Sequence, residues 1–267
     1  MNFDSTHGLK EFRDTRMYVQ YAIGGIAGVG VVSAFYLFKA AGNDQPQLLI
    51  AAAAALVVAL IASGFVYFRF GKPVVLRQTA EGIQRVCGER EQTIAYDDLA
   101  GFRARWTDVI RNGVYQTTMV RFALRSRDAG ERVINYDSSA MYDTVKYEQL
   151  QEFQNEVSAA VATQMADELE RTGRVDWTAK LAIRRDGLEI VRKAGAAPEV
   201  VAFDRVSDWK VDQGLFKLGI DGSHRPVLLE QTTEWNFYPG LLLWSHCSHQ
   251  QSGESVPNEE VPLTLVN

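Results

Sequence analysis

VQYAIGGIAGVGVVSAFYLF, residues 19–38, and LLIAAAAALVVALIASGFVYF, residues 48–68, are two apolar runs in the first quarter of a chain of 267 residues. Each run has about 20 residues, and a helix of that length rises about 30 Å, which matches the hydrocarbon core of a bilayer. Only a short, mostly polar stretch separates them. The pattern predicts a transmembrane hairpin over residues 18–70, with spans at 19–38 and 48–68.

Small residues recur at a spacing of four in both runs. Gly24 and Gly28 do so in the first run, and the second run has a matching row at Ala51, Ala55, Ala59 and Ser63. A row of small residues on one helix face lets another helix approach closely. We expect these rows to form the contact between the two spans; the alternative is that they join neighbouring hairpins into a homo-oligomer. Neither run contains Asp, Glu, Lys or Arg, so the sequence does not indicate a channel or a transporter.

Basic residues flank the outer ends of both runs. They are Lys10, Arg13 and Arg16 before the first run and Arg69, Lys72 and Arg77 after the second, whereas the loop between the runs has Lys39 alone. Lys and Arg close to a membrane helix are retained on the cytoplasmic side. The sequence therefore predicts a multi-pass membrane protein with both termini in the cytoplasm. Residues 1–17 are expected to be a polar cytoplasmic leader that is helical only near the bilayer.

The charge balance bounds the class of partner. The chain has 28 Lys and Arg against 33 Asp and Glu, a formal net charge of −5. A protein without overall basic character is not expected to bind nucleic acid. A length of 267 residues leaves room for two small domains after the hairpin.

Two short patterns recur in the same order after the hairpin. LRQTAEGIQRV at residues 76–86 and LAIRRDGLEIV at 181–191 each have the pattern of a β-hairpin with Gly at the turn. IAYDDLAGF at 94–102 then corresponds to VAFDRVSDW at 201–209. Two aligned segments in one order indicate an internal repeat.

Alternating strands and one helix follow in each copy. Strands are expected at 102–106, 115–125 and 132–136 in the first copy and at 209–211, 215–220 and 227–231 in the second. An apolar stripe predicts a helix at 144–171, capped by Asp143 or Ser139 and stopped at Gly173. The second copy offers a shorter helix, 239–249, opened by Asn236. Residues 250–267 are expected to be a disordered tail, in which 261–266 have the pattern of an edge strand.

This arrangement resembles the bacterial pleckstrin-homology-like (PH-like) domains found beside short transmembrane hairpins. The likeness rests on about seven antiparallel strands closed by a helix, and on the IAYDDL and VAFDRV steps that lead into an aromatic strand. It covers two units, 73–172 and 175–249, the second with a shortened helix. The resemblance implies an α+β fold of curved antiparallel sheets capped by helices, located at the bacterial cytoplasmic (inner) membrane. It implies binding of lipid headgroups, peptides or proteins, and no catalysis or cofactor.

Four arginines are candidates for a binding surface. Arg103, Arg105, Arg121 and Arg125 alternate with apolar residues, so strand geometry places them on one solvent-facing side. Beside an anionic leaflet each basic group would gain about 1 kcal/mol. The alternative is a solvated sheet face whose arginines pair with local carboxylates such as Asp108.

The chemistry-bearing residues give no catalytic or metal signature. His246 and His249 are spaced to share a helix face, with Cys247 between them, but no further ligand has a recognisable spacing. We expect no catalytic residue, metal or cofactor. Three function classes follow: a non-catalytic membrane-anchored module that binds a partner protein or anionic lipid, an accessory or scaffold subunit of a larger membrane complex, and an enzyme with a site between the two copies.

Overall fold

The structure is a computed structural model that describes residues 10–14, 17–41, 46–70, 74–127, 133–142, 144–193, 195–223 and 225–252. The fold is α+β, with two apolar helices near the N-terminus, then several antiparallel sheets and a C-terminal helix. The chain divides into two compact units. The hairpin unit comprises Lys10–Arg77 and Arg85–Gln92, and the β unit comprises Gln78–Gln84 and the described residues from Thr93 onward.

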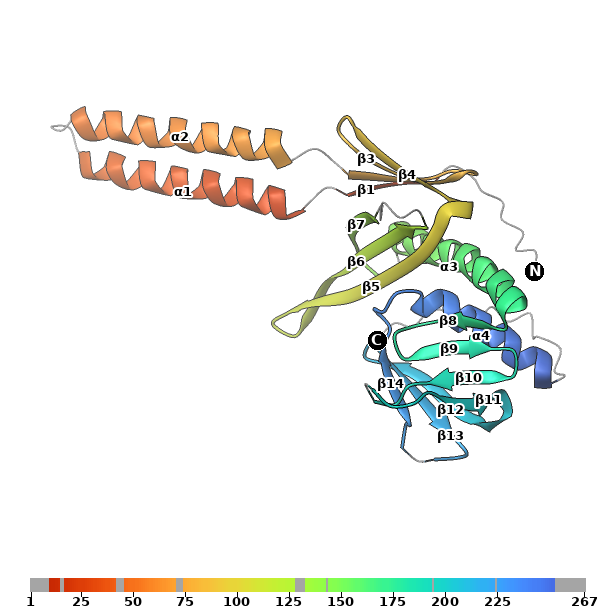
Figure 1. Cartoon of the computed structure of the whole chain (residues 1–267). Coiled ribbons are helices and arrows are strands. Elements are labelled where there is room, and N and C mark those ends of the chain that lie inside the picture. The colour runs from red at the N-terminus through yellow and green to blue at the C-terminus, as the bar shows by residue number, and fades with distance from the viewer. Residues whose placement is uncertain are drawn as a thin grey trace. The chain divides into compact units, whose positions relative to one another are not determined.

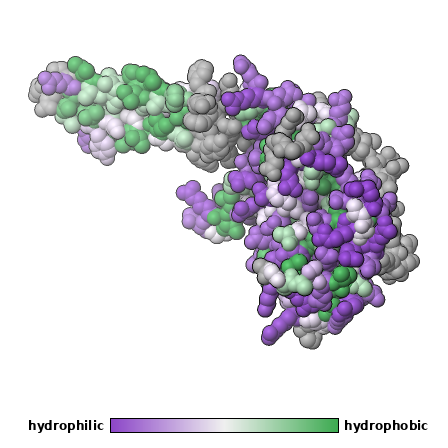
Figure 2. Space-filling model, in the orientation of Figure 1, coloured by the Kyte–Doolittle hydropathy of each residue, from purple (hydrophilic) through white to green (hydrophobic). Residues whose placement is uncertain are grey.

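The hairpin unit contains two long apolar helices, α1 (Met17–Ala41) and α2 (Pro46–Phe70), which lie side by side in Figure 1. Within them, Ala22–Ala40 and Gln47–Tyr67 are long and apolar enough to cross a membrane, and only 11% of each stretch is buried. Figure 2 shows the apolar residues on the face of the hairpin in view. Both helices extend a few residues beyond the predicted spans.

The two helices meet through small residues, but not at the glycines that the sequence indicated. A Cβ on Gly30 would lie 2.3 Å from the Cβ of Ala59, so the backbones approach closely there. Nothing lies within 4 Å of a Cβ built on Gly24 or Gly28. Ala55, Ala59 and Ser63 are half-buried as expected for a packing face, whereas Ala51 is exposed. The row through Gly30 therefore replaces the predicted row through Gly24 and Gly28.

The predicted leader contains a strand, which corrects the expectation of a helical approach to the bilayer. Strand β1 (Lys10–Asp14) is the first strand of a four-stranded sheet in the order β1-β2-β3-β4. The others are β2 (Val74–Gln78), β3 (Gly82–Cys87) and β4 (Arg90–Ala95). Phe12 is buried, and Arg77 Nε lies 3.4 Å from Glu11 Oε2. The hairpin is therefore inserted between two neighbouring strands of one sheet.

The β unit begins with three long antiparallel strands and a helix. A 3₁₀ turn (Tyr96–Asp98) leads into β5 (Leu99–Arg111), β6 (Val114–Ser126) and β7 (Val133–Ala140), which form a sheet in that order. The strands are longer than predicted, and the expected start at Arg132 lies outside the described residues. Arg105 is paired directly with Arg121, so the predicted common face is correct.

Helix α3 (Val145–Thr172) confirms the predicted apolar stripe. Its stripe residues Leu150, Phe153, Val157, Val161, Met165 and Leu169 are all buried. Thr144 caps the helix by accepting from the backbone N–H of Tyr147, in place of the predicted Ser139, and Asp143 lies outside the described residues. Gly173 ends the helix in the left-handed conformation, as predicted.

The rest of the β unit has two further sheets and the last helix. The first sheet, in the order β11-β10-β9-β8, contains β8 (Arg174–Asp176), β9 (Leu181–Arg184), β10 (Gly187–Ile190) and β11 (Glu199–Ala202). After a 3₁₀ turn (Phe203–Arg205), β12 (Val206–Asp212), β13 (Leu215–Ile220) and β14 (Leu228–Gln231) form the other. Helix α4 (Phe237–Ser252) is longer than predicted, and the rest of the predicted tail lies outside the described residues.

Helix α4 packs tightly on Trp177 through Gly240, and this contact gives a stability prediction. A Cβ on Gly240 would lie 2.0 Å from Cδ1 and 2.3 Å from Nε1 of Trp177, which is buried and donates from Nε1 to the carbonyl of Phe237 at 2.8 Å. We expect Gly240→Ala to lower the free energy of unfolding by about 1–3 kcal/mol, even though Ala favours helices. Urea unfolding in mild detergent, followed by tryptophan fluorescence, measures the loss.

Gly219→Ala is the matched control, because the nearest atom to a Cβ there is 3.4 Å away, an ordinary contact distance. An equal loss of stability in both variants would contradict the steric explanation.

Candidate functional site

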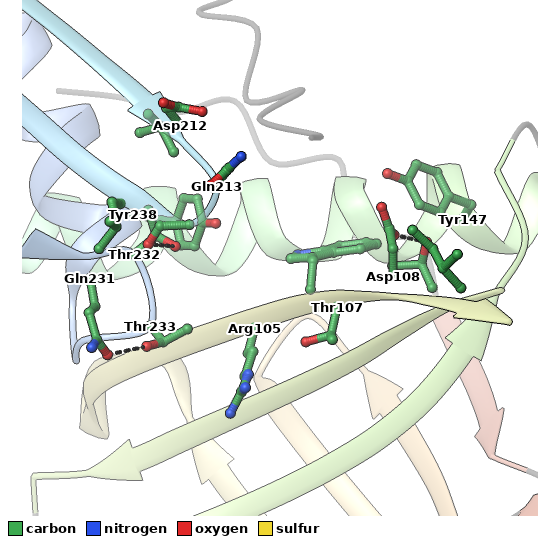
Figure 3. Close-up of a pocket in the computed structure, with 16 residues that line it drawn as sticks. Arg105, Thr107, Asp108, Tyr147, Asp212, Gln213, Gln231, Thr232, Thr233 and Tyr238 are labelled. Carbon is green, nitrogen blue, oxygen red and sulfur yellow. Dashed lines mark hydrogen bonds between the residues drawn. The ribbon is translucent and has the colours of Figure 1, made fainter. Parts of the chain in front are cut away.

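A cleft of about 880 Å³ lies along strand β5 within the β unit, and we call it the β5 cleft (Figure 3). One wall is formed by residues 105–108 of β5 together with Tyr147 of α3. The opposite wall is formed by the β12–β13 turn, residues 211–215, by residues 231–233 at the end of β14, and by Tyr238 of α4. Two parts of the chain about a hundred residues apart therefore line one cavity.

The β5 wall is an edge strand whose side chains alternate between the two sides of its sheet. In the order β5-β6-β7 only β6 pairs with β5 along its length, so the other edge of β5 faces the cleft. Trp106 belongs to the core side, where its Nε1 donates to Gln154 Oε1 at 2.6 Å and its ring packs on Tyr147. Arg105 and Thr107 point to the other side of the strand in Figure 3.

Asp108 is held by hydroxyl groups at one end of the cleft. Its Oδ1 accepts from Thr118 Oγ1 at 2.7 Å, and its Oδ2 accepts from the Tyr142 hydroxyl. The rings of Tyr142 and Tyr115 stack with centroids 4.3 Å apart. Burial, followed by the hydrogen bond to Asp108, raises the pKa of Tyr142 to about 12. The network therefore keeps this tyrosine neutral and fixes the end of β5 to the segment that precedes α3.

The opposite wall is a tight turn with left-handed residues. Gln213 and Gly214 have φ of 50° and 73°, which lets β12 return directly into β13. The Gly214 carbonyl accepts from the backbone N–H of Thr232 at 3.0 Å and from its hydroxyl at 3.2 Å. Asp212 Oδ2 lies 2.5 Å from Lys217 Nζ, and this bond lowers the pKa of the carboxyl. The wall presents amide and hydroxyl groups, with its carboxylate neutralised.

Asn236 joins the two walls through the backbone of β5. The backbone N–H of Phe102 donates to Asn236 Oδ1 at 2.9 Å, and the backbone N–H of Asn236 donates to the Phe102 carbonyl at 2.8 Å. Asn236 has a φ of 60°, a conformation that Asn tolerates better than most residues. It immediately precedes α4, as the sequence indicated. Its two bonds with the N–H and the C=O of Phe102 resemble the pair of bonds that a residue of a neighbouring antiparallel strand makes.

Trp235 lies between two of the four candidate arginines. The guanidinium carbons of Arg103 and Arg125 are each 4.9 Å from the centre of its ring, a distance typical of cation–π contacts. A Cβ on Gly101 would lie 3.3 Å from Trp235, so the absence of a side chain there makes room for the indole. This pair of arginines therefore holds a tryptophan of the same chain.

The other two candidate arginines differ in their partners. Arg121 Nε lies 2.5 Å from Asp137 Oδ1 on the adjacent strand. Arg105 lines the cleft and has no carboxylate within ion-pair distance among the residues that the structure describes. Asp108 is bonded to hydroxyls and is not the partner that the sequence suggested. The four arginines share a face, and Arg105 is the one of these four for which the described residues provide neither a carboxylate nor an aromatic partner.

Sequence reasoning did not single out Trp235 or the cleft. Trp235 stands in a polar stretch, TTEWN. An isolated tryptophan among polar residues is the sequence signal that could have indicated a side chain that packs on another part of the protein. Among the described residues, no group of three or more His, Cys, Asp or Glu side chains is placed to hold a metal ion. Cys247 lies on α4, where burial raises the pKa of its thiol.

Asn236 gives a prediction that separates its side-chain bonds from its backbone conformation. Asn236→Gly keeps the left-handed φ without strain and keeps the backbone bond to the Phe102 carbonyl, but it removes the side-chain oxygen that accepts from the Phe102 N–H. We therefore expect faster hydrogen exchange at the Phe102 amide and a loss of about 1 kcal/mol of stability. Asn236→Ala loses the same bond and adds backbone strain of about 1 kcal/mol or more. Equal stability of the two variants would contradict the strained geometry.

Tyr142 gives a pH prediction. A group whose pKa is higher in the folded state stabilises the protein below its unfolded pKa, and this contribution is lost as the pH rises through the folded pKa. The contribution of Tyr142 should therefore be full below about pH 10 and disappear by about pH 12. Burial also raises the pKa of Tyr238, so ultraviolet titration of tyrosinate should show more than one late-titrating group, and Tyr142→Phe should remove one of them. In Asp108→Asn the Tyr142 hydroxyl should titrate at a lower pH, because the negative charge of its hydrogen-bond partner is lost. An unchanged titration would refute the contribution of Asp108 to the raised pKa.

Comparison of the sequence with models of known protein families and with curated proteins gives no match. The assignment of a function therefore rests on geometry. That geometry is a polar cleft beside an edge strand, with the hydroxyl network around Asp108 in its lining and with Asn236 bonded to the same strand at Phe102.

Proposed function

We propose that this chain is a non-catalytic, membrane-anchored interaction module of the bacterial cytoplasmic membrane, which presents two PH-like units and binds a partner protein in the β5 cleft. The observation that carries the proposal is the polar cleft within the β unit, between the open edge of β5 and the β12–β13 turn. PH-like membership, membrane location, orientation and partner binding are parts of this proposal, and each rests on a separate argument.

The exposure of the hairpin supports a membrane anchor. Val29, Ile50 and Leu60 are 68–70% exposed, and many other large apolar residues of the two helices are exposed as well. A core helix of a water-soluble protein would bury such residues, and an apolar surface of this extent in water favours association or insertion. Exposed Tyr36 and Tyr67 near the helix ends suit the interfacial region of a bilayer.

The position of β1 supports one shared side for both ends of the hairpin. Because β1 and β2 are neighbours in a sheet, the residues just before and just after the hairpin lie on the same side of any membrane that it crosses. Lys10, Arg13 and Arg77 on these strands favour the cytoplasmic side by the positive-inside rule. Arg16 and Lys72 lie outside the described residues.

The order of elements supports two PH-like units. When the hairpin helices α1 and α2 are set aside, the elements from β1 to α3 are four strands, a 3₁₀ turn, three strands and a helix. The described residues repeat this order from β8 to α4. Gly82 and Gly187 occupy corresponding hairpins, where an added Cβ would lie 2.3 Å from the Ile94 carbonyl and 2.1 Å from the Val201 carbonyl. The same steric requirement at the same place favours duplication of one unit.

The cleft favours binding of a protein over catalysis or lipid contact. Asp108 already accepts from two hydroxyls, and Asp212 is paired with Lys217, so neither carboxylate is placed as a free general base. Arg103 and Arg125 stack on Trp235, and Arg121 pairs with Asp137, which weakens the case for a lipid face. What is left is an accessible edge strand between polar walls.

An accessory-subunit role is the second candidate, and one observation favours it. Gly24, Gly25 and Gly28 form a small-residue face on α1 that α2 does not cover. Such a face permits close packing of another transmembrane helix, from a larger complex or from a second copy. A stoichiometric membrane partner in mild detergent that is lost with Gly24→Leu and Gly28→Leu would favour this role.

Membrane fractionation combined with site-specific cross-linking tests the main proposal. We expect the full chain to stay in the membrane pellet after high-salt and alkaline washes, and protease to reach its C-terminal half only in inverted vesicles. A photoreactive residue at Gln213, in the cleft, should give one discrete cross-linked protein, whereas the exposed control position Glu168 on α3 should not. Release into the supernatant, or identical cross-linking at both positions, would refute it.

A further inference from the structure

The open edge of β5 has a defined run of backbone groups that point into the cleft. Phe102 uses its N–H and C=O to bind Asn236, so these groups point away from β6. Residues along an antiparallel strand alternate between bonding the neighbour and pointing outward. The β5–β6 register is regular from Gly101 to Val109, so Ala104, Trp106 and Asp108 also point their backbone groups outward.

These three residues have no outward partner within the described part of the chain. None of their backbone groups takes part in the bonds that tie β5 to other elements, which are made by Ala100 and Phe102. Asn236 has the two-bond pattern of a strand partner at Phe102, and its Nδ2 also donates to the Ala100 carbonyl at 3.4 Å, but none of these bonds reaches Ala104 or the residues after it. Ala104 is fully buried and does not line the cleft, whereas Trp106 and Asp108 line it, so these two positions are a template for another strand, as unpaired edges are in general.

The cleft fits an extended segment in size and charge. A volume of about 880 Å³ lies within the range of ligand sites and is enough for a strand of several residues. Arg105 stands directly opposite Arg121 on the outer face, and only Arg121 has a carboxylate partner among the described residues. One positive charge is thus unbalanced beside the edge, and a glutamate or aspartate of the bound segment would balance it.

We propose that the β5 cleft binds an extended, acidic peptide segment of a partner protein, which pairs with Trp106 and Asp108 as an added strand and places a carboxylate on Arg105. The inference rests on the proposed function and names the partner chemistry for its site. Backbone pairing supplies affinity that depends little on sequence, and Arg105 supplies selectivity for acidic side chains.

The experiment uses the full chain in detergent micelles and three six-residue probe peptides, TVEVTV and its variants with lysine or glutamine in place of glutamate. At peptide concentrations up to about 1 mM, we expect the amides of Trp106 and Asp108 to exchange about tenfold more slowly with TVEVTV. The amides of Arg103, Arg105 and Thr107, which already face β6, should not change. A TVEVTV peptide with N-methyl groups on alternate amides should give no protection.

Charge reversal tests the role of Arg105. Arg105→Glu should weaken TVEVTV about tenfold and strengthen the lysine peptide, because the favourable charge pair becomes a repulsive one. Arg111→Glu is the matched control, since it makes the same charge change on β5 beyond the bulge at Val109 and Ile110 and does not line the cleft. Equal effects of the two substitutions would refute the Arg105 contact.

Absence of protection with all three probes overturns strand addition. It would do so even where the chain remains in the membrane and cross-links through Gln213, so the failure is distinct from failure of the proposed function. Slow exchange of the Trp106 and Asp108 amides before any peptide is added, relieved in a variant that ends at Ser252, would assign the cleft to the chain's own C-terminal residues and also overturn the proposal.

Discussion

The docking of Trp235 and Asn236 on β5 is the interaction on which the geometry of the cleft depends. Asn236 gives the edge strand a two-bond partner at Phe102, and Trp235 fills the space above Gly101 between two guanidinium groups. Both residues directly precede α4, which in turn packs on Trp177. Thr232, which bonds the Gly214 carbonyl of the β12–β13 turn, lies three residues before Trp235, so a short connection joins this turn to β5, and such a connection favours a preformed binding site.

Local periodicity predicted the elements whose contacts are close in sequence. The apolar stripe of α3, the hairpin turns and the common face of Arg105 and Arg121 all follow from helix and strand periods. Strand β1 could not be predicted in this way, because it has one buried apolar residue, Phe12, and its partner β2 follows some 60 residues later. The spacing of small residues in α1 likewise allows several rows, and only the contact with Ala59 selects the row through Gly30.

The candidate site shows the same limit. Alternation placed the arginines correctly, but a strand pattern carries no information about which residues approach from elsewhere in the chain. Trp235 lies more than a hundred residues after Arg125 in the sequence, and it converts half of an apparent anion-binding face into an internal contact. The segment that precedes α4 bonds β5 at Ala100 and Phe102, and the cleft lies farther along the strand, where residues 105–108 line it.

The spacing of two strands and the spacing of two packed helices are close enough for the hairpin to be inserted between β1 and β2. Neighbouring strands lie about 5 Å apart and packed helices about 8–10 Å apart, so an antiparallel helix pair can follow directly from two adjacent strands with short connections. Because β1 pairs with β2, the sheet can be completed only after α1 and α2 have brought the chain back. If the hairpin lies in the membrane as proposed, its closure precedes completion of the sheet, and anchoring of the chain and folding of the β1–β4 sheet become one event.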